Sequence, residues 1–178
     1  MALTIFSKTN NFHGYLVYYD EVMKMKKQTK VYLIAIAFPL LVGALAAFLT
    51  RNTMDIYKSI IRPPLSPPSW LFPVAWTILY VLMGIGSARV YLKEEAVTLP
   101  LKIYFVQLFV NFLWSLLFFN ARVFLIAFLW LLLLIALVIA MIRTFDAVDK
   151  TAAKLQWPYL LWTVFAAYLN LAIYLLNR

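Results

Sequence analysis

RPPLSPPSWLFPVAWTILY, residues 62–80, is the stretch that decides how the rest of the chain is arranged. It holds five of the eight prolines and joins a loop to an apolar run. A proline ring fixes φ and has no N–H to donate, so the prolines as far as Pro68 cannot lie inside a helix. Each proline also pushes the residue before it towards extended geometry. We therefore predict a stiff, extended loop as far as Pro68, an N-cap at Ser69 and a helix from Trp70, with Pro73 in its first turn.

The composition of the chain indicates an integral membrane protein. Its 178 residues are 65% hydrophobic and 13% charged, with a mean hydropathy of +0.86, whereas soluble domains are about 45–50% apolar and about 25% charged. The absence of cysteine excludes disulfides, thiolate metal ligands and cysteine nucleophiles. The net charge of +9 fits loop lysines and arginines beside anionic lipid better than it fits nucleic-acid binding.

Five apolar runs each approach the ~20 residues that cross a bilayer as a helix. Backbone groups in lipid must be satisfied within their own segment, so each run is predicted to be helical. The predicted helices are 31–49, 70–91, 99–119, 123–145 and 157–176. The fold class is therefore an all-α membrane protein in which residues 28–178 form one five-helix transmembrane domain, with a long proline-rich loop between the first two helices. Residues 1–27 are predicted to be a polar, poorly ordered tail.

The distribution of lysine and arginine predicts the orientation in the membrane. The N-terminal tail, the loop at 92–98 and the loop at 146–156, with their flanks, carry eleven of these residues, and the opposite side carries five. The positive-inside rule places the more basic side in the cytoplasm. We therefore expect the N-terminus and these two loops in the cytoplasm, and the first loop and the C-terminus outside.

The predicted membrane segments lack the groups that support common chemistries. None of the five runs contains Asp, Glu or His, which leaves no conventional proton relay. The sequence shows no acid–base pair, no nucleotide-binding loop and no cluster of metal ligands, so we predict no metal site and no tightly bound cofactor. It also shows no inverted repeat of the kind found in ion-coupled transporters.

Tryptophan is the most informative residue type that remains. Trp70 and Trp157 lie near predicted helix ends and suit an aromatic belt at the membrane interface. Trp76, Trp114 and Trp162 lie about 7–10 Å or more inside their helices at ~1.5 Å per residue. A belt explains these three less well.

A polar stripe accompanies the tryptophans on the third predicted helix. Gln107, Asn111 and Ser115 recur every four residues and share one face. Such residues commonly form hydrogen bonds between membrane helices. They also suit a polar-dotted aromatic cavity, the usual form of a small-molecule site. The sequence leaves both interpretations open.

Three motifs resemble the signature of the TspO/MBR family, which comprises the tryptophan-rich sensory proteins and the translocator protein, or peripheral-type benzodiazepine receptor. The motifs occur in the family's order and are Pro63–Tyr80 followed by Met83–Ser87, Gln107–Phe119 and Pro158–Asn170. The resemblance runs from about residue 30 to the end of the chain. It departs from the family's pattern at Leu65, where many members have tryptophan.

The resemblance implies a five-helix bundle, often a homodimer, with a ligand pocket closed by the first loop. It implies a membrane binding protein or sensor for porphyrins such as protoporphyrin IX and for benzodiazepine-type ligands. Carried over by motif position, the pocket residues are Pro67, Trp76, Tyr80, Asn111, Trp114, Ser115, Trp162 and Phe165. Some bacterial members degrade protoporphyrin in light, which would give Trp76 and Trp162 a photo-oxidative role. The chain has no conventional catalytic constellation to add to them.

Two alternative functions stay open at this level. One is an enzyme that consumes porphyrin as a committed reaction, and the other is a transporter of porphyrin, lipid or sterol. The absence of coupling carboxylates makes active transport the least favoured. Depth counting also places Trp76 near the outer side and Trp162 nearer the inner side. If both line one pocket, either the pocket is elongated or the last helix begins earlier than residue 157.

Overall fold

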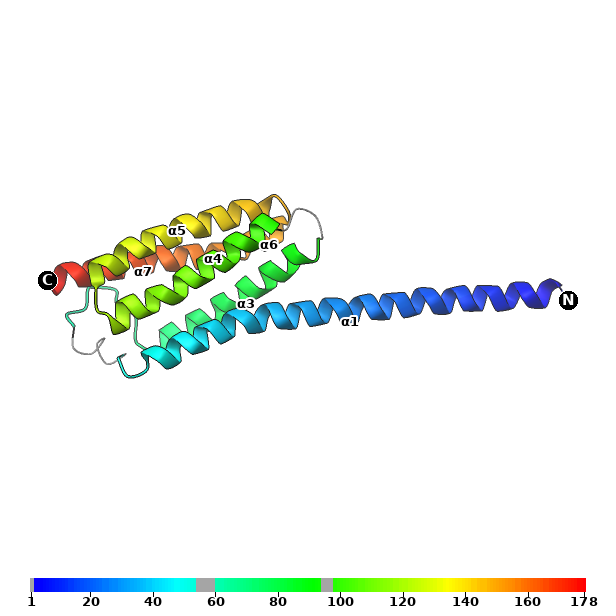
Figure 1. The fold of residues 1–178 in the computed structure, drawn as a ribbon, viewed down its shortest axis with the longest axis horizontal. Helices are drawn as coiled ribbons and strands as arrows, with labels where there is room; N and C mark the ends of the chain where they lie inside the picture. Colours follow the sequence, from blue (N-terminus) through cyan, green and yellow to red (C-terminus); the bar gives the residue numbers. More distant parts are fainter. Residues whose placement is uncertain (1, 54–59, 94–97) are drawn as a thin grey trace.

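The computed structural model describes residues 2–53, 60–93 and 98–178 of the chain (Figure 1). Every regular element in this part of the chain is helical. The elements are α1 (Ala2–Thr50), α3 (Leu71–Tyr91), α4 (Thr98–Ser115), the π-helix η1 (Leu116–Asn120), α5 (Phe124–Asp146), α6 (Lys150–Lys154) and α7 (Trp157–Leu176). Within the described ranges, five helices are long and apolar enough to cross a membrane. The predicted all-α fold with five spanning helices is confirmed.

The packing order of the helices encloses one interior. α1 packs against α3 and α4, α4 packs against α5, and α5 packs against α7, while α6 contacts both α5 and α3. The N-terminal part of α1 extends beyond the bundle, whereas the C-terminus lies at the opposite end (Figure 1). The buried core inside this arrangement draws side chains from α3, α4, α5 and α7, and Leu40 and Val42 of α1 pack against it.

The first helix differs from the prediction at its N-terminal end. α1 begins at Ala2, whereas we expected the first helix to begin near residue 31. The expected poor order of residues 1–27 stays a prediction. The chain has no proline before Pro39, so no residue on the N-terminal side of the apolar run removes a helical hydrogen bond. The helix therefore continues through both regions.

The proline-rich loop contains a tight turn and is not extended throughout. Ser66 N and Ser66 Oγ donate to Pro63 O at 3.3 and 2.7 Å, and Leu65 has a φ of 70°. This is the pattern of a type II turn, with Pro64 in the second position and a left-handed residue in the third. A left-handed conformation costs a residue with a Cβ about 1–2 kcal/mol, so Leu65 occupies a position that favours glycine.

The start of α3 also differs from the prediction. Its N-cap is Trp70, which makes no side-chain capping hydrogen bond, so the prediction of Ser69 as N-cap is wrong. Leu71 N donates to Pro68 O at 3.0 Å, and this turn carries Ser69 and Trp70 in its centre. Trp70 already has helical backbone angles, and the serine side chain is therefore one residue too early to cap the helix.

Three hydrogen bonds attach the described part of the loop to α7. Ile61 N donates to Asn177 Oδ1, and Asn177 Nδ2 donates to Ile61 O, both at 2.9 Å. Tyr168 Oη donates to Pro64 O at 3.2 Å. The loop therefore lies over the C-terminal half of α7.

At the opposite end of the bundle, Asp149 connects α6 to α3. Its Oδ1 accepts from Ala152 N at 2.8 Å, which caps α6. Arg89 Nε and Nη2 donate to Oδ1 and Oδ2 at 3.1 and 2.9 Å, and the Asp149 side chain is 5% exposed. The hydrogen bonds from Arg89, aided by the Ala152 N–H, hold the pKa of Asp149 below its usual range.

We expect Asp149→Asn to lower the free energy of unfolding by about 1–3 kcal/mol at pH 7, because bonds to a charged partner are lost. The lower part of this range applies because Arg89 is one-third exposed and partly screened. A lowered folded-state pKa contributes stability above the unfolded value of ~3.9, and this stability is lost as the pH falls through the folded pKa. Thermal unfolding in one detergent at pH 7 and pH 3 measures both effects, with exposed Asp146→Asn as the matched control. An equal loss at both pH values would contradict this account of Asp149.

Candidate functional site

A cavity of about 370 Å³ lies between α1, α3, α4 and η1 and is only partly enclosed. We call it the aromatic cavity. Its volume falls within the ~300–1,000 Å³ typical of small-molecule sites. It is lined by Leu40, Gly43, Ala44, Ala46, Ala47 and Thr50 of α1, by Phe72, Pro73, Trp76, Thr77 and Tyr80 of α3, by Trp114 and Ser115 of α4, and by Phe119 of η1.

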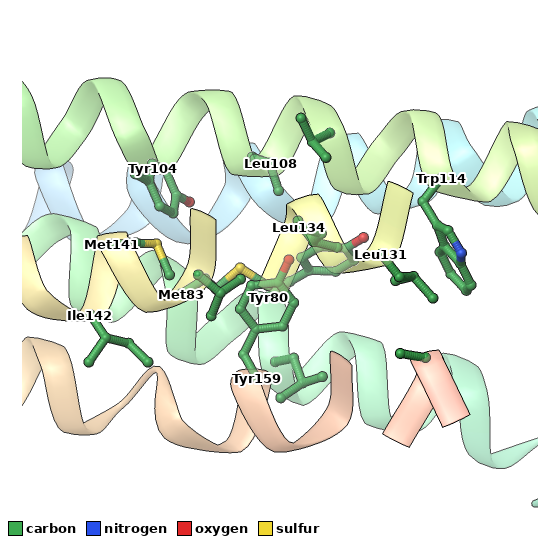
Figure 2. Packing of buried hydrophobic residues seen from close by; sticks show 14 of the residues in the cluster. Tyr80, Met83, Tyr104, Leu108, Trp114, Leu131, Leu134, Met141, Ile142 and Tyr159 are labelled. Atoms are coloured by element: carbon green, nitrogen blue, oxygen red, sulfur yellow. The ribbon is translucent and has the colours of Figure 1, made fainter. Parts of the chain in front are cut away.

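Aromatic rings form a continuous series along one wall of this cavity. The rings of Trp76 and Tyr80 stack with centroids 5.4 Å apart, and the Trp76 and Trp114 rings lie 6.5 Å apart with an interplanar angle of 35°. Tyr80 and Trp114 are buried, while Trp76 is half-buried. Figure 2 shows Tyr80 lying in the interior of the bundle close to Met83 and Tyr159. The wall therefore presents flat π-faces to a ligand.

Small residues on α1 form the wall of the cavity that faces the aromatic rings. A Cβ at Gly43 would overlap the Cε2, Cδ2 and Cζ atoms of the Tyr80 ring, so the ring packs directly on the α1 backbone. Ala44 and Ala47 also belong to the α1 wall of the cavity. Larger side chains at these positions would fill the cavity.

The polar stripe of α4 serves both roles that the sequence left open, because some of its residues form hydrogen bonds between helices and one lines the cavity. Gln107 Oε1 accepts from Tyr159 Oη at 2.9 Å, which is a hydrogen bond between helices. Asn111 Nδ2 donates to Tyr80 Oη at 3.3 Å, immediately behind the cavity wall. Ser115 lines the aromatic cavity itself.

Two buried polar atoms beside the aromatic cavity lack partners. Among the described residues, neither Trp114 Nε1 nor Asn111 Oδ1 has a hydrogen-bond partner. An unsatisfied buried group costs about 1–3 kcal/mol. A ligand with an acceptor near Trp114 Nε1 recovers part of this free energy.

The structure brings four of the predicted pocket residues into one cavity wall and separates the others. Trp76, Tyr80, Trp114 and Ser115 line the aromatic cavity, with Asn111 one layer behind. The residues outside this wall are Trp162, Phe165 and Pro67.

Trp162 and Phe165 lie on α7, behind Phe72. Their rings are 5.9 Å apart, and the Trp162 ring lies 6.1 Å from the ring of Phe72, which does line the cavity. Trp76 in turn lies 6.1 Å from Tyr159. The two helices therefore run in opposite directions, and the Trp162 ring lies beside the N-terminal end of α3. α7 itself begins at Trp157, as predicted.

Pro67 is buried within the proline-rich loop. Ile61 and Pro64 of that loop are hydrogen-bonded to Asn177 and Tyr168, and none of its described residues, 60–70, lines the aromatic cavity. Residues 54–59, the remainder of the predicted lid, lie outside the described ranges.

Sequence reasoning missed the α1 side of the site. Close helix packing is the more frequent role of small residues such as Gly43 in membrane helices, so these residues do not by themselves indicate a cavity. The spacing of Gly43, Ala44 and Ala47 could have indicated this wall, but the same spacing is found both in closely packed helices and in helices that line cavities. Phe72 was overlooked because it stands within a motif dominated by proline and tryptophan.

These features define a five-helix membrane protein with a tryptophan-lined cavity between its helices. The chain belongs to the TspO/MBR family, whose model matches residues 35–176. It is 34% identical over 157 residues to the tryptophan-rich protein TspO of Chlorobaculum tepidum, covering 86% of this chain and 99% of the relative. It is 39% identical over 145 residues to that of Archaeoglobus fulgidus (78% and 91%) and 38% identical over 138 residues to the translocator protein of Bos taurus (74% and 81%).

Proposed function

We propose that this protein is a membrane binding protein or sensor that takes a flat, apolar ligand in the aromatic cavity. The observation that carries the proposal is the series of Trp76, Tyr80 and Trp114 rings beside the unpaired Trp114 Nε1. Aromatic faces stack on flat π-systems, and the indole N–H fixes a ligand that carries an acceptor. Porphyrins such as protoporphyrin IX and benzodiazepine-type compounds share this chemistry, and the family resemblance supports both.

The size of the cavity distinguishes the two ligand types. At about 370 Å³ it lies at the small end of the range for ligand sites. We expect a benzodiazepine-sized compound to be held within this volume and a tetrapyrrole to extend into the open side of the cavity. Arg51 directly follows Thr50, which lines the cavity, and its guanidinium lies 3.9 Å from the Phe48 ring centroid. We propose that Arg51 meets a porphyrin carboxylate there.

The same contacts favour a second candidate function, the light-dependent oxidation of bound porphyrin by oxygen. Indole and phenol are the oxidisable side chains beside the ligand, and those of Trp76 and Tyr80 are stacked. Trp162 is not among the residues that line the cavity, but its ring contacts that of Phe72, which does line it. We therefore expect Trp76 to contribute more than Trp162 to any such reaction.

Titration with protoporphyrin IX tests the proposal. Tryptophan fluorescence of the wild-type protein should be quenched saturably, and Trp76→Phe should weaken binding roughly twofold to tenfold, since a favourable ring pair contributes about 0.5–1.5 kcal/mol. The matched control is Trp157→Phe, because Trp157 is 52% exposed on α7 and should leave the affinity unchanged.

Illumination of the same samples separates the binder from the oxidising protein. Loss of the porphyrin Soret band that Trp76→Phe slows would support oxidation, and a stable spectrum would support binding alone. The absence of saturable quenching in the wild-type protein would contradict porphyrin as the ligand.

A further inference from the structure

A second cavity, of about 310 Å³, lies between α1, α3 and α4 at the end of the bundle near α6. Among the described residues it shares none of its lining with the aromatic cavity. Its wall is almost wholly apolar and includes Phe38 and Phe105, whose rings meet edge to face at 5.5 Å. Val31 and Leu101 line the end of this cavity that lies farthest from the middle of the bundle. The cavity is partly open, and both phenylalanines are about half-exposed on the outer surface of the bundle.

One polar group in this wall lacks a well-formed hydrogen bond. Tyr104 is 2% exposed, and within the part of the chain that the structure describes its hydroxyl has the nearby Ser87 hydroxyl as a weak partner and no partner at good geometry. Ser87, in the same wall, donates its own hydroxyl proton to Gly84 O at 3.0 Å. Figure 2 shows Tyr104 reaching from α4 into the bundle. A buried hydroxyl that is poorly satisfied favours a ligand that supplies a better acceptor.

Two lysines are next in sequence to the residues Val31 and Leu101 that line one end of the second cavity. Lys30 directly precedes Val31, and Lys102 directly follows Leu101. Both lysines are exposed. Val31 and Leu101, which line this end of the cavity, are therefore each next in sequence to an exposed lysine, and two positive charges from different helices attract the head group of an anionic lipid.

The depths of these groups match the layers of a lipid. The polar layer at each membrane face is roughly 5–8 Å thick. Counted from Thr98 at ~1.5 Å per residue, Lys102 lies about 6 Å and Tyr104 about 9 Å along α4. With Thr98 taken as the membrane surface, this count puts Lys102 at the level expected of the phosphates and Tyr104 at that of the ester carbonyls, with Phe105 just below.

We propose that the second cavity binds one anionic glycerophospholipid. Its phosphate lies between Lys30 and Lys102, an ester carbonyl accepts the Tyr104 hydroxyl proton, and one acyl chain runs along Phe38 and Phe105. The proposal is independent of the ligand of the aromatic cavity, because the two sites have different walls.

Native mass spectrometry of the detergent-purified full chain tests the head-group part. The probes are phosphatidylglycerol and phosphatidylcholine with identical chains. Both lipids carry a phosphate, but the choline cation of phosphatidylcholine offsets the attraction of its phosphate to the lysines. We therefore expect the wild type to prefer phosphatidylglycerol by about tenfold, since each lysine near a net negative head group contributes severalfold. Lys30→Gln with Lys102→Gln should abolish the preference, and the matched pair Lys150→Gln with Lys154→Gln on α6 should keep it. Equal retention of both lipids by the wild type would overturn the proposal.

Ester-linked and ether-linked phosphatidylglycerol test the contact to Tyr104, because the ether lipid has no carbonyl. Tyr104→Phe should weaken binding of the ester lipid about twofold to tenfold, the usual worth of one neutral hydrogen bond, and leave the ether lipid unaffected. An equal loss for both lipids, or no loss for either, would overturn the assigned contact. Protoporphyrin titrations of these variants should match the wild type, which keeps a failure of this proposal distinct from a failure at the aromatic cavity.

Discussion

Replacing Gly84 by valine should lower the free energy of unfolding by about 1–3 kcal/mol, the usual range for overpacking a tight interface. A Cβ at Gly84 would lie 2.5 Å from Ile36 Cα and 2.6 Å from Ala35 O. These are backbone atoms, so no rotamer change relieves the overlap and α1 has to move away from α3. The gain in helix propensity is at most ~1 kcal/mol and does not offset this loss.

A graded series of glycine variants measures this effect by thermal unfolding in one detergent. Gly84→Ala should fall between the wild type and Gly84→Val. The matched control is Gly86→Ala, whose Cβ would mainly meet Gln156 Nε2, the far end of a flexible side chain. That variant should be the mildest of the three. A loss for Gly86→Ala as large as for Gly84→Ala would contradict the backbone contact as the cause.

The spanning helices could be predicted because hydrophobic length is a property of the sequence itself. The last predicted helix, 157–176, coincides with α7, and the predicted 99–119 corresponds to α4 followed by η1. The short helix α6 could not be predicted, since its cap depends on Asp149 and a partner sixty positions away, Arg89. The turn at Leu65 was missed for a related reason. Its left-handed backbone is held by bonds from Ser66 to Pro63, whereas propensity alone assigns such a position to glycine.

The candidate site was predictable only in part. The motifs identified Trp76, Tyr80 and Trp114, which do line one cavity. They could not show that Phe72 stands between this cavity and Trp162, because the rotation of α7 against α3 depends on packing among several helices. The α1 wall could not be predicted either, because a small residue such as Gly43 permits either a close contact or a space, and only the partner helix decides which.

The central claim is that a flat apolar ligand occupies the aromatic cavity, and cysteine protection tests it most directly. The chain contains no cysteine, so Ala47→Cys introduces a single thiol, at a position that lines the cavity. Leu45→Cys is the matched control, because Leu45 lies on the same helix, is 51% exposed and is not part of the cavity wall.

We predict that protoporphyrin IX at ten times its Kd slows labelling of the thiol at position 47 by N-ethylmaleimide about tenfold, in proportion to the unoccupied fraction. Labelling at position 45 should keep its rate, and a benzodiazepine-type compound should protect position 47 in the same way. Equal labelling of position 47 with and without saturating amounts of either ligand would contradict the account.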